Sequence, residues 1–129
     1  MKIRTKQEEQ NRMQRINQEY EWYKDRDVLG IDLATVINKA VNNNEKQEIE
    51  KDKDGYYIED ENYSIKVEIY MITNNTTYQM EAIYKLGVTR FIENFNLVSF
   101  KCTDIEYHKK TGLVSKLYFT QTDEFSYEI

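Results

Sequence analysis

The stretch Ile31-Asp-Leu-Ala-Thr-Val-Ile-Asn-Lys-Ala-Val-Asn-Asn-Asn44 decides the fold class of the chain. Its apolar residues recur at spacings of three and four, which places them in one stripe along an α-helix: Leu33, Val36, Ile37, Ala40 and Val41. We expect Asp32, or the residue before it, to cap the first turn. The three asparagines 42–44 are expected to end the helix, because Asn tolerates the left-handed backbone found at helix ends. The stripe needs an apolar partner, and we expect a sheet built from the second half of the chain.

At 129 residues the chain has the length of a single domain, and such a domain buries roughly two thirds of its unfolded surface. Its one cysteine, Cys102, cannot form a disulfide within the chain, so the fold depends on packing. The net charge of −5 argues against a nucleic-acid partner, because phosphates demand a basic surface. No apolar run approaches the roughly 20 residues that span a bilayer, so we expect the domain itself to be soluble.

Residues 2–24 are predicted to form a long, polar first helix. Apolar side chains repeat at spacings of three and four only in its second half, as a narrow seam: Met13, Ile16, Tyr20 and Tyr23. Residues 1–24 carry six basic and four acidic side chains, a net of +2 in an otherwise acidic chain. The first three turns have no apolar side to bury, so they either fray or are held by something outside the domain. We therefore divide the chain into a polar helix and candidate tether, residues 1–24, and a single α+β domain, residues 25–129.

The part of the chain after the central helix is strongly acidic. Residues 45–62, which we call the acidic segment, contain eight acidic residues and three lysines, a local net of −5 (3 − 8). Residues 47–51 and 56–58 are predicted as two short strands joined at Asp54-Gly55, a dipeptide that favours hairpin turns because both positions tolerate positive φ. We interpret the segment as a solvated acidic hairpin.

Alternating apolar residues predict the strands of the sheet. Residues 65–71 alternate most regularly between apolar and polar side chains. Two long strands, residues 98–108 and 113–121, follow near the end of the sequence and are joined by a four-residue turn that ends at Gly112. Residues 25–30 are predicted as a turn into the central helix.

A further helix is predicted between these strands. Thr76 and Gln79 have the spacing of a capping box, and Gly87 stands where a glycine ends a helix. A short helical turn follows, with Phe91 and Phe95 four residues apart. The predicted fold is α+β. A long N-terminal helix and a second amphipathic helix pack on an antiparallel sheet of about four to five strands, with a further helix between the middle and C-terminal strands.

One acidic pattern is typical of a calcium-binding loop. Glu50, Asp52, Asp54 and Glu61 stand at positions 1, 3, 5 and 12 of that spacing, with Gly55 at position 6, and oxygen ligands suit a hard cation. Glu50 stands where the pattern needs the shorter Asp. The residues after Glu61 alternate as a strand, whereas a calcium hand needs a helix there. We therefore predict no metal site, and these four carboxylates are the candidate calcium ligands if one exists.

Cys102 and His108 are the only thiol and the only imidazole, which makes them the candidate nucleophile and base. On one strand, six residues at roughly 3.3 Å each separate them by about 20 Å, far beyond hydrogen-bond reach. Structural zinc usually takes four Cys or His ligands, which the chain lacks, and neither a phosphate-binding glycine loop nor a nucleophile elbow is present. We predict a protein that is not an enzyme, with no catalytic residues and no cofactor.

Several short stretches together resemble uncharacterised small proteins of low-GC Gram-positive bacteria. They are Val28-Leu29-Gly30-x-Asp32-Leu33-x-x-x-Ile37-Asn38-Lys39, Phe100-Lys101-Cys102-Thr103, Tyr107-His108 and Thr111-Gly112. Those proteins are typically membrane-anchored and pilin-like, with a long N-terminal helix before a sheet domain. The resemblance implies an extracytoplasmic, membrane-tethered protein. In that case this chain is the soluble part, and the basic residues 2–6 lie next to a membrane reached through a segment absent from this sequence.

The leading hypothesis is a non-enzymatic structural or protein-interaction domain, the soluble part of a tethered cell-surface or pilus- or secretion-associated protein. Its partner is another protein. The alternative is a small cytosolic binding or inhibitor protein whose acidic segment meets a basic partner. A calcium-binding module is the third hypothesis.

Overall fold

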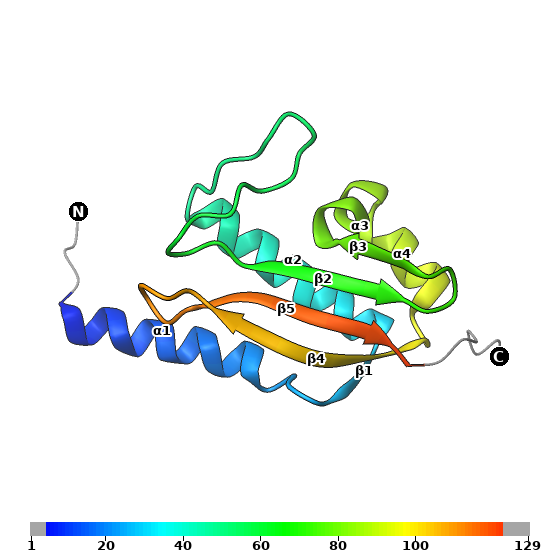
Figure 1. The fold of residues 1–129 in the computed structure, drawn as a ribbon, viewed down its shortest axis with the longest axis horizontal. Helices are drawn as coiled ribbons and strands as arrows, with labels where there is room; N and C mark the ends of the chain where they lie inside the picture. The colour runs from blue at the N-terminus through cyan, green and yellow to red at the C-terminus, as the bar shows by residue number, and fades with distance from the viewer. Residues whose placement is uncertain (1–4, 123–129) are drawn as a thin grey trace.

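The computed structural model describes residues 5–122 as four helices and a five-stranded sheet (Figure 1). In chain order the elements are α1 (Lys6–Glu21), β1 (Asp27–Leu29), α2 (Gly30–Lys46), β2 (Lys66–Met71), β3 (Thr76–Gln79), α3 (Met80–Leu86), α4 (Val88–Phe95), β4 (Ser99–Tyr107) and β5 (Val114–Gln121). The predicted α+β class is therefore confirmed. The predicted strands 65–71, 98–108 and 113–121 are confirmed as β2, β4 and β5.

The sheet has the order β1-β4-β5-β2-β3 and is mixed, because β2 and β5 run parallel while the other neighbours are antiparallel. The prediction of a wholly antiparallel sheet is wrong at this pair. The physical reason lies in the connections: α3 and α4 carry the chain from β3 to β4, on the far side of the sheet. The β4–β5 hairpin then places β5 beside β2 in the same direction, at the centre of the sheet, where Leu117 and Phe119 are buried.

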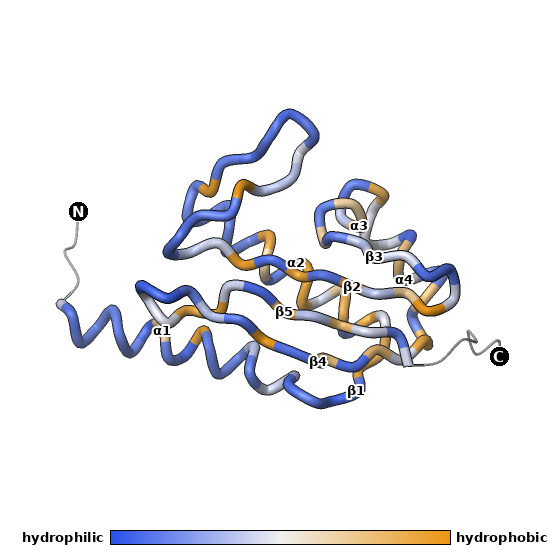
Figure 2. The backbone as a smooth tube through the Cα atoms, in the orientation of Figure 1, coloured by the Kyte–Doolittle hydropathy of each residue, from blue (hydrophilic) through white to orange (hydrophobic). Residues whose placement is uncertain are grey.

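The apolar stripe of α2 packs on one face of this sheet, as the sequence predicts. All five stripe residues are almost fully buried: Leu33, Val36, Ile37, Ala40 and Val41. In Figure 1, α2, α3 and α4 lie behind the strands, and Figure 2 shows hydrophobic residues on α2 and on the strands in front of it. The core lies between these layers, and the inward side chains of the strands include Val67, Ile69 and Phe100.

The ends of α2 differ from the prediction. The helix begins at Gly30 after Leu29, and no side chain caps it, so Asp32 lies inside the first turn. A side chain at Gly30 would clash, because an added Cβ would lie 1.9 Å from the carbonyl oxygen of Phe95. The three asparagines do not end the helix, which continues to Lys46. Asn44 is buried, and its side-chain amide bonds to Ile65, the residue before β2: it accepts from the Ile65 N–H at 2.8 Å and donates to the Ile65 carbonyl at 2.9 Å.

Helix α1 begins at Lys6, where the Thr5 hydroxyl accepts a hydrogen bond from the Glu8 N–H. The predicted seam is confirmed: Tyr20 and Tyr23 are buried, and Met13 and Ile16 are half-buried. The side-chain amide of Asn17 holds the helix against the β4–β5 turn, by bonds to the Gly112 carbonyl at 2.9 Å and the Val114 N–H at 2.8 Å. The turns before Met13 are largely exposed. Residues 2–4 of the predicted helix lie outside the described residues.

Two local predictions in the middle of the chain are wrong. Residues 47–51 and 56–58 form no strands; the segment has a single bridge, Lys51 with Tyr57. The Asp52 carboxylate accepts hydrogen bonds from the backbone N–H groups of Asp54 and Tyr56. These two N–H groups are therefore not available for hydrogen bonds between two strands. The turn at Asp54-Gly55 is present, and Gly55 has a φ of +88°.

The capping-box prediction is wrong, because residues 76–79 form β3 and the helix begins only at Met80. The Gln79 side chain donates to Glu68 across the β2–β3 pair instead of turning back to a helix start. Residues 27–29, predicted within a turn, pair with β4 as β1. Gly87 ends α3 as predicted, and Phe91 and Phe95 lie on the helix α4 that follows.

Candidate interaction site

An apolar pocket lies between the β2–β3 hairpin and the helices α3 and α4, and we call it the hairpin pocket. It has a volume of about 140 Å³. Six apolar or aromatic side chains form most of its wall: Met71, Tyr78, Ile83, Leu86, Phe91 and Phe95. Three polar residues complete its lining: Asn74, Arg90 and Asn94. A cavity of this composition suits an apolar group with a polar or acidic neighbour.

The local sequence explains how these walls arise. Phe91 and Phe95 are one helical turn apart on α4, and their rings contact each other with centroids 5.4 Å apart. Phe91 also contacts Phe100 of β4, which fixes α4 on the sheet. Gly87 turns the chain between α3 and α4 with a φ of +99°, a backbone conformation that residues other than glycine rarely adopt. The two short helices thus form an angled wall above the end of the hairpin.

The rim of the pocket leaves apolar surface in contact with water. Leu86 is 66 % exposed and nearby Tyr84 is 47 % exposed. Exposed apolar surface beside a cavity is typical of a site that another molecule covers. Arg90 is also exposed, and its guanidinium forms no ion pair with any residue between 5 and 122. The rim therefore offers apolar contact together with one positive charge.

Strand β3 adjoins the pocket and forms one edge of the sheet. Tyr78, which lines the pocket, belongs to this strand. On its inner side β3 pairs with β2, whereas no backbone–backbone hydrogen bond joins its outer side to another part of the described chain. An unpaired edge can accept a further strand, because its N–H and C=O groups are free to pair.

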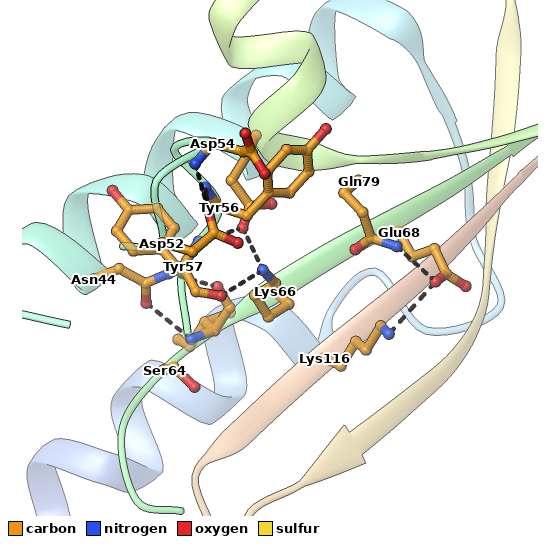
Figure 3. A network of polar contacts seen from close by, with 12 residues as sticks. Asn44, Asp52, Asp54, Tyr56, Tyr57, Ser64, Lys66, Glu68, Gln79 and Lys116 are labelled. Carbon is orange, nitrogen blue, oxygen red and sulfur yellow. Dashed lines mark hydrogen bonds and ion pairs between the residues drawn. The ribbon is translucent and has the colours of Figure 1, made fainter. Parts of the chain in front are cut away.

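A buried polar network lies beside the same hairpin (Figure 3). The Lys66 ammonium contacts the Glu81 carboxylate, and the two side chains are only 7 % and 3 % exposed. Tyr57 joins both partners, since its carbonyl accepts from Lys66 at 3.0 Å and its N–H donates to Glu81 Oε2 at 2.9 Å. The other oxygen, Oε1, has no hydrogen-bond partner among the described residues. The network fastens the acidic segment to β2 and to the first turn of α3. Sequence reasoning missed it, because Lys66 follows the polar alternation of an ordinary exposed strand face.

Two of the four candidate calcium ligands are engaged in other contacts. Asp52 holds the backbone of its own turn, and Glu61 forms an ion pair with Lys110 of the β4–β5 turn. The residues after Glu61 lead into β2 rather than into a helix. Among residues 5–122, no group of three or more His, Cys, Asp or Glu side chains could hold a metal ion.

Cys102 and His108 are both buried, and no hydrogen bond joins them. Burial raises the pKa of the Cys102 thiol to about 11, so at neutral pH the thiolate needed for nucleophilic attack is scarce. The His108 ring bonds through Nε2 to the Ser64 carbonyl at 2.7 Å, and this contact ties the end of β4 to the start of β2. In this geometry both residues stabilise the fold.

Comparison with known proteins finds no match, whether to a family model, to a curated protein or to a solved structure. None of the described helices is long and apolar enough to cross a membrane. The geometry itself defines an α+β domain with an apolar pocket beside β3, whose outer side pairs with no other strand of residues 5–122.

Proposed function

We propose that the protein is a non-enzymatic protein-interaction domain that binds an apolar segment of a partner protein in the hairpin pocket. The observation that carries this proposal is the apolar lining of the pocket together with the exposed Leu86 at its rim. Burying a side chain of the size of Leu or Phe contributes about 1.5–3 kcal/mol, so one such side chain in the pocket is a useful anchor for binding.

The form of the partner segment follows from β3. An extended segment that pairs with the outer side of β3 gains main-chain hydrogen bonds, and its alternate side chains point to the same side. One bulky apolar side chain then enters the hairpin pocket, while an acidic residue beside it meets Arg90. The expected partner is therefore an extended segment with one large apolar anchor and a neighbouring Asp or Glu.

Helix α1 is the part of the chain that we propose as the tether. Its contacts with the domain begin near Met13, while the preceding turns are polar and exposed. The resemblance to membrane-anchored, pilin-like proteins favours the same arrangement, in which α1 connects an extracytoplasmic domain to a membrane segment outside this sequence. In Figure 1 the N-terminal end of α1 lies at the opposite end of the molecule from α3 and α4, so the tether would leave the hairpin pocket free.

The acidic segment supports a second candidate, a cytosolic binding or inhibitor protein with a basic partner. Four of its acidic side chains make contacts within the domain: Glu45, Asp52, Asp60 and Glu61. The other four form no ion pair within residues 5–122: Glu48, Glu50, Asp54 and Glu59. Exposed charges contribute little each in water, which is why we place this candidate second.

Selection of peptides from a random display library on the full chain tests the first proposal. We expect the selected peptides to carry a bulky apolar residue. Their affinity should fall more than about tenfold, or about 1.4 kcal/mol, in Leu86→Asp. The matched control is Ile58→Asp, since Ile58 is also exposed, at 50 %, but belongs to the acidic segment. Equal binding to both variants would contradict the proposal, and a steep loss of binding with added salt would favour the acidic segment instead.

A further inference from the structure

Residues 123–129, Asp-Glu-Phe-Ser-Tyr-Glu-Ile, follow directly after the described part of the chain. Their apolar residues Phe125, Tyr127 and Ile129 alternate with the polar Ser126 and Glu128. In an extended chain this alternation gives one apolar side and one polar side. Such an apolar side could pack on an exposed apolar surface, and the hairpin pocket is such a surface.

The described chain ends beside the hairpin pocket. The Thr122 N–H donates to the Ser99 carbonyl at 2.9 Å, and Ser99 follows α4, whose Phe95 lines the pocket. Gln121 bonds to Thr73 on the other side: its Oε1 accepts from the Thr73 N–H at 3.2 Å, and its Nε2 donates to the Thr73 hydroxyl at 2.7 Å. Thr73 immediately precedes Asn74 in the pocket lining. The last described residues, Gln121 and Thr122, therefore lie beside two segments that lead into the pocket lining. A fully extended stretch of seven residues would span up to about 25 Å.

Charge favours the same occupant. Residues 123–129 contain three acidic side chains and no basic one, a net of −3 (0 − 3). Arg90 at the pocket rim forms no ion pair within the described part of the chain, so it is open to a carboxylate. The segment thus combines the two features expected of a partner for this site, a bulky apolar side chain and an adjacent acid.

We propose that residues 123–129 bind in the hairpin pocket of their own chain and compete there with the partner segment. This inference rests on the proposed function, because it assigns a regulatory occupant to the same site. Binding within the chain is favoured over binding to a second copy, since a short link gives an effective concentration in the millimolar range. With an effective concentration of about 1 mM and an intrinsic dissociation constant of about 0.1 mM, the segment weakens partner binding about tenfold.

Paramagnetic relaxation in the full chain tests whether the segment occupies the pocket. Ser126→Cys provides a site for a nitroxide label, because the native Cys102 is fully buried. We expect the methyl signals of Met71 and Ile83 to lose most of their intensity, while that of Met13 on α1 keeps it. The matched control carries the label together with Phe125→Asp, Tyr127→Asp and Ile129→Asp, and there the Met71 and Ile83 signals should recover.

The results distinguish this inference from the proposed function. Undiminished Met71 and Ile83 signals would overturn the inference. Broadening that appears in an unlabelled copy mixed with a labelled one would also overturn it, by making a second copy the occupant. In either case, peptides that bind wild type and fail on Leu86→Asp leave the proposed function standing. If the segment occupies the pocket but no peptide binds even the triple aspartate variant, the proposed function fails. Both stand if the triple variant binds the selected peptides about tenfold more tightly than wild type.

Discussion

Replacing Lys66 with Met would break the buried ion pair that fastens the acidic segment to β2 and α3. Methionine keeps the apolar stem of lysine and removes only the ammonium group. The Glu81 carboxylate would keep one hydrogen bond, from the Tyr57 N–H at 2.9 Å, while its Oε1 already has no partner in residues 5–122. The Tyr57 carbonyl would also lose the bond that it accepts from Lys66 at 3.0 Å. The substitution therefore leaves the Glu81 carboxylate and the Tyr57 carbonyl buried without the Lys66 ammonium group that both of them contact.

The expected loss of unfolding free energy is large for this reason. Removal of one partner from a buried ion pair costs about 3–5 kcal/mol, and both side chains here are less than a tenth exposed. We therefore expect a loss of about 4 kcal/mol for Lys66→Met. In the double variant with Glu81→Gln, no charge remains buried and an amide oxygen still accepts from Tyr57. That variant should recover about 2 kcal/mol of the loss.

Urea unfolding followed by circular dichroism measures both effects. With a slope of about 1.5 kcal/mol per molar urea, the single substitution should lower the midpoint by about 2.5 M. The matched control is Lys116→Met, because Lys116 lies directly opposite Lys66 in the β2–β5 register. Its ion pair with Glu68 is partly exposed, at 3.4 Å, so its loss should cost about 0–1 kcal/mol. If Lys66→Met is no more destabilising than Lys116→Met, the buried pair does not stabilise the fold as we argue.

Four further results are expected. Ile37→Ala should cost about 2–5 kcal/mol, because Ile37 is fully buried at the centre of the α2–sheet interface; an unchanged urea midpoint would contradict that placement. Deletion of residues 2–11 should leave the melting temperature nearly unchanged, and a loss of ten degrees or more would show that these turns pack on the domain. Millimolar calcium should neither release binding heat nor raise the melting temperature, since a cation bound only to the native state would stabilise it. Alkylation of Cys102 in the native protein should stay slow until the pH approaches its pKa of about 11, and rapid alkylation at pH 7 would contradict its burial.

The elements with strong periodicity were predictable from the sequence alone. The α2 stripe and the alternation in β2 reflect burial on one side of a single element, so the local pattern contains the information needed. The same holds for Gly87 and Gly112, whose positive φ suits the turns where they stand. The pairing of strands was less predictable. Strands β2 and β5 are far apart in the sequence and pair in parallel at the centre of the sheet. No local pattern in either strand predicts this pairing or its direction.

The errors arose where a tertiary contact outweighed a local signal. Thr76 and Gln79 have the spacing of a helix start, but Gln79 bonds to Glu68 across the strand pair and the residues remain extended. Asn residues often end helices, but Asn44 lies inside α2, where the backbone of Ile65, just before β2, satisfies its side-chain amide. In both cases a polar side chain found its partner in another element, so the local preference did not decide the structure.

The hairpin pocket could not be predicted, because its wall comes from four elements that each bury apolar side chains in an ordinary way. Its existence depends on the turn at Gly87, which ends α3 and starts α4 at an angle. That turn keeps Leu86, the last residue of α3, at the rim instead of in the core. A glycine that the sequence marks only as a helix end therefore decides where apolar surface stays exposed. Exposed apolar surface of this kind gains free energy when another molecule covers it, so the turn that shapes the pocket also provides the contact surface on which the proposed function depends.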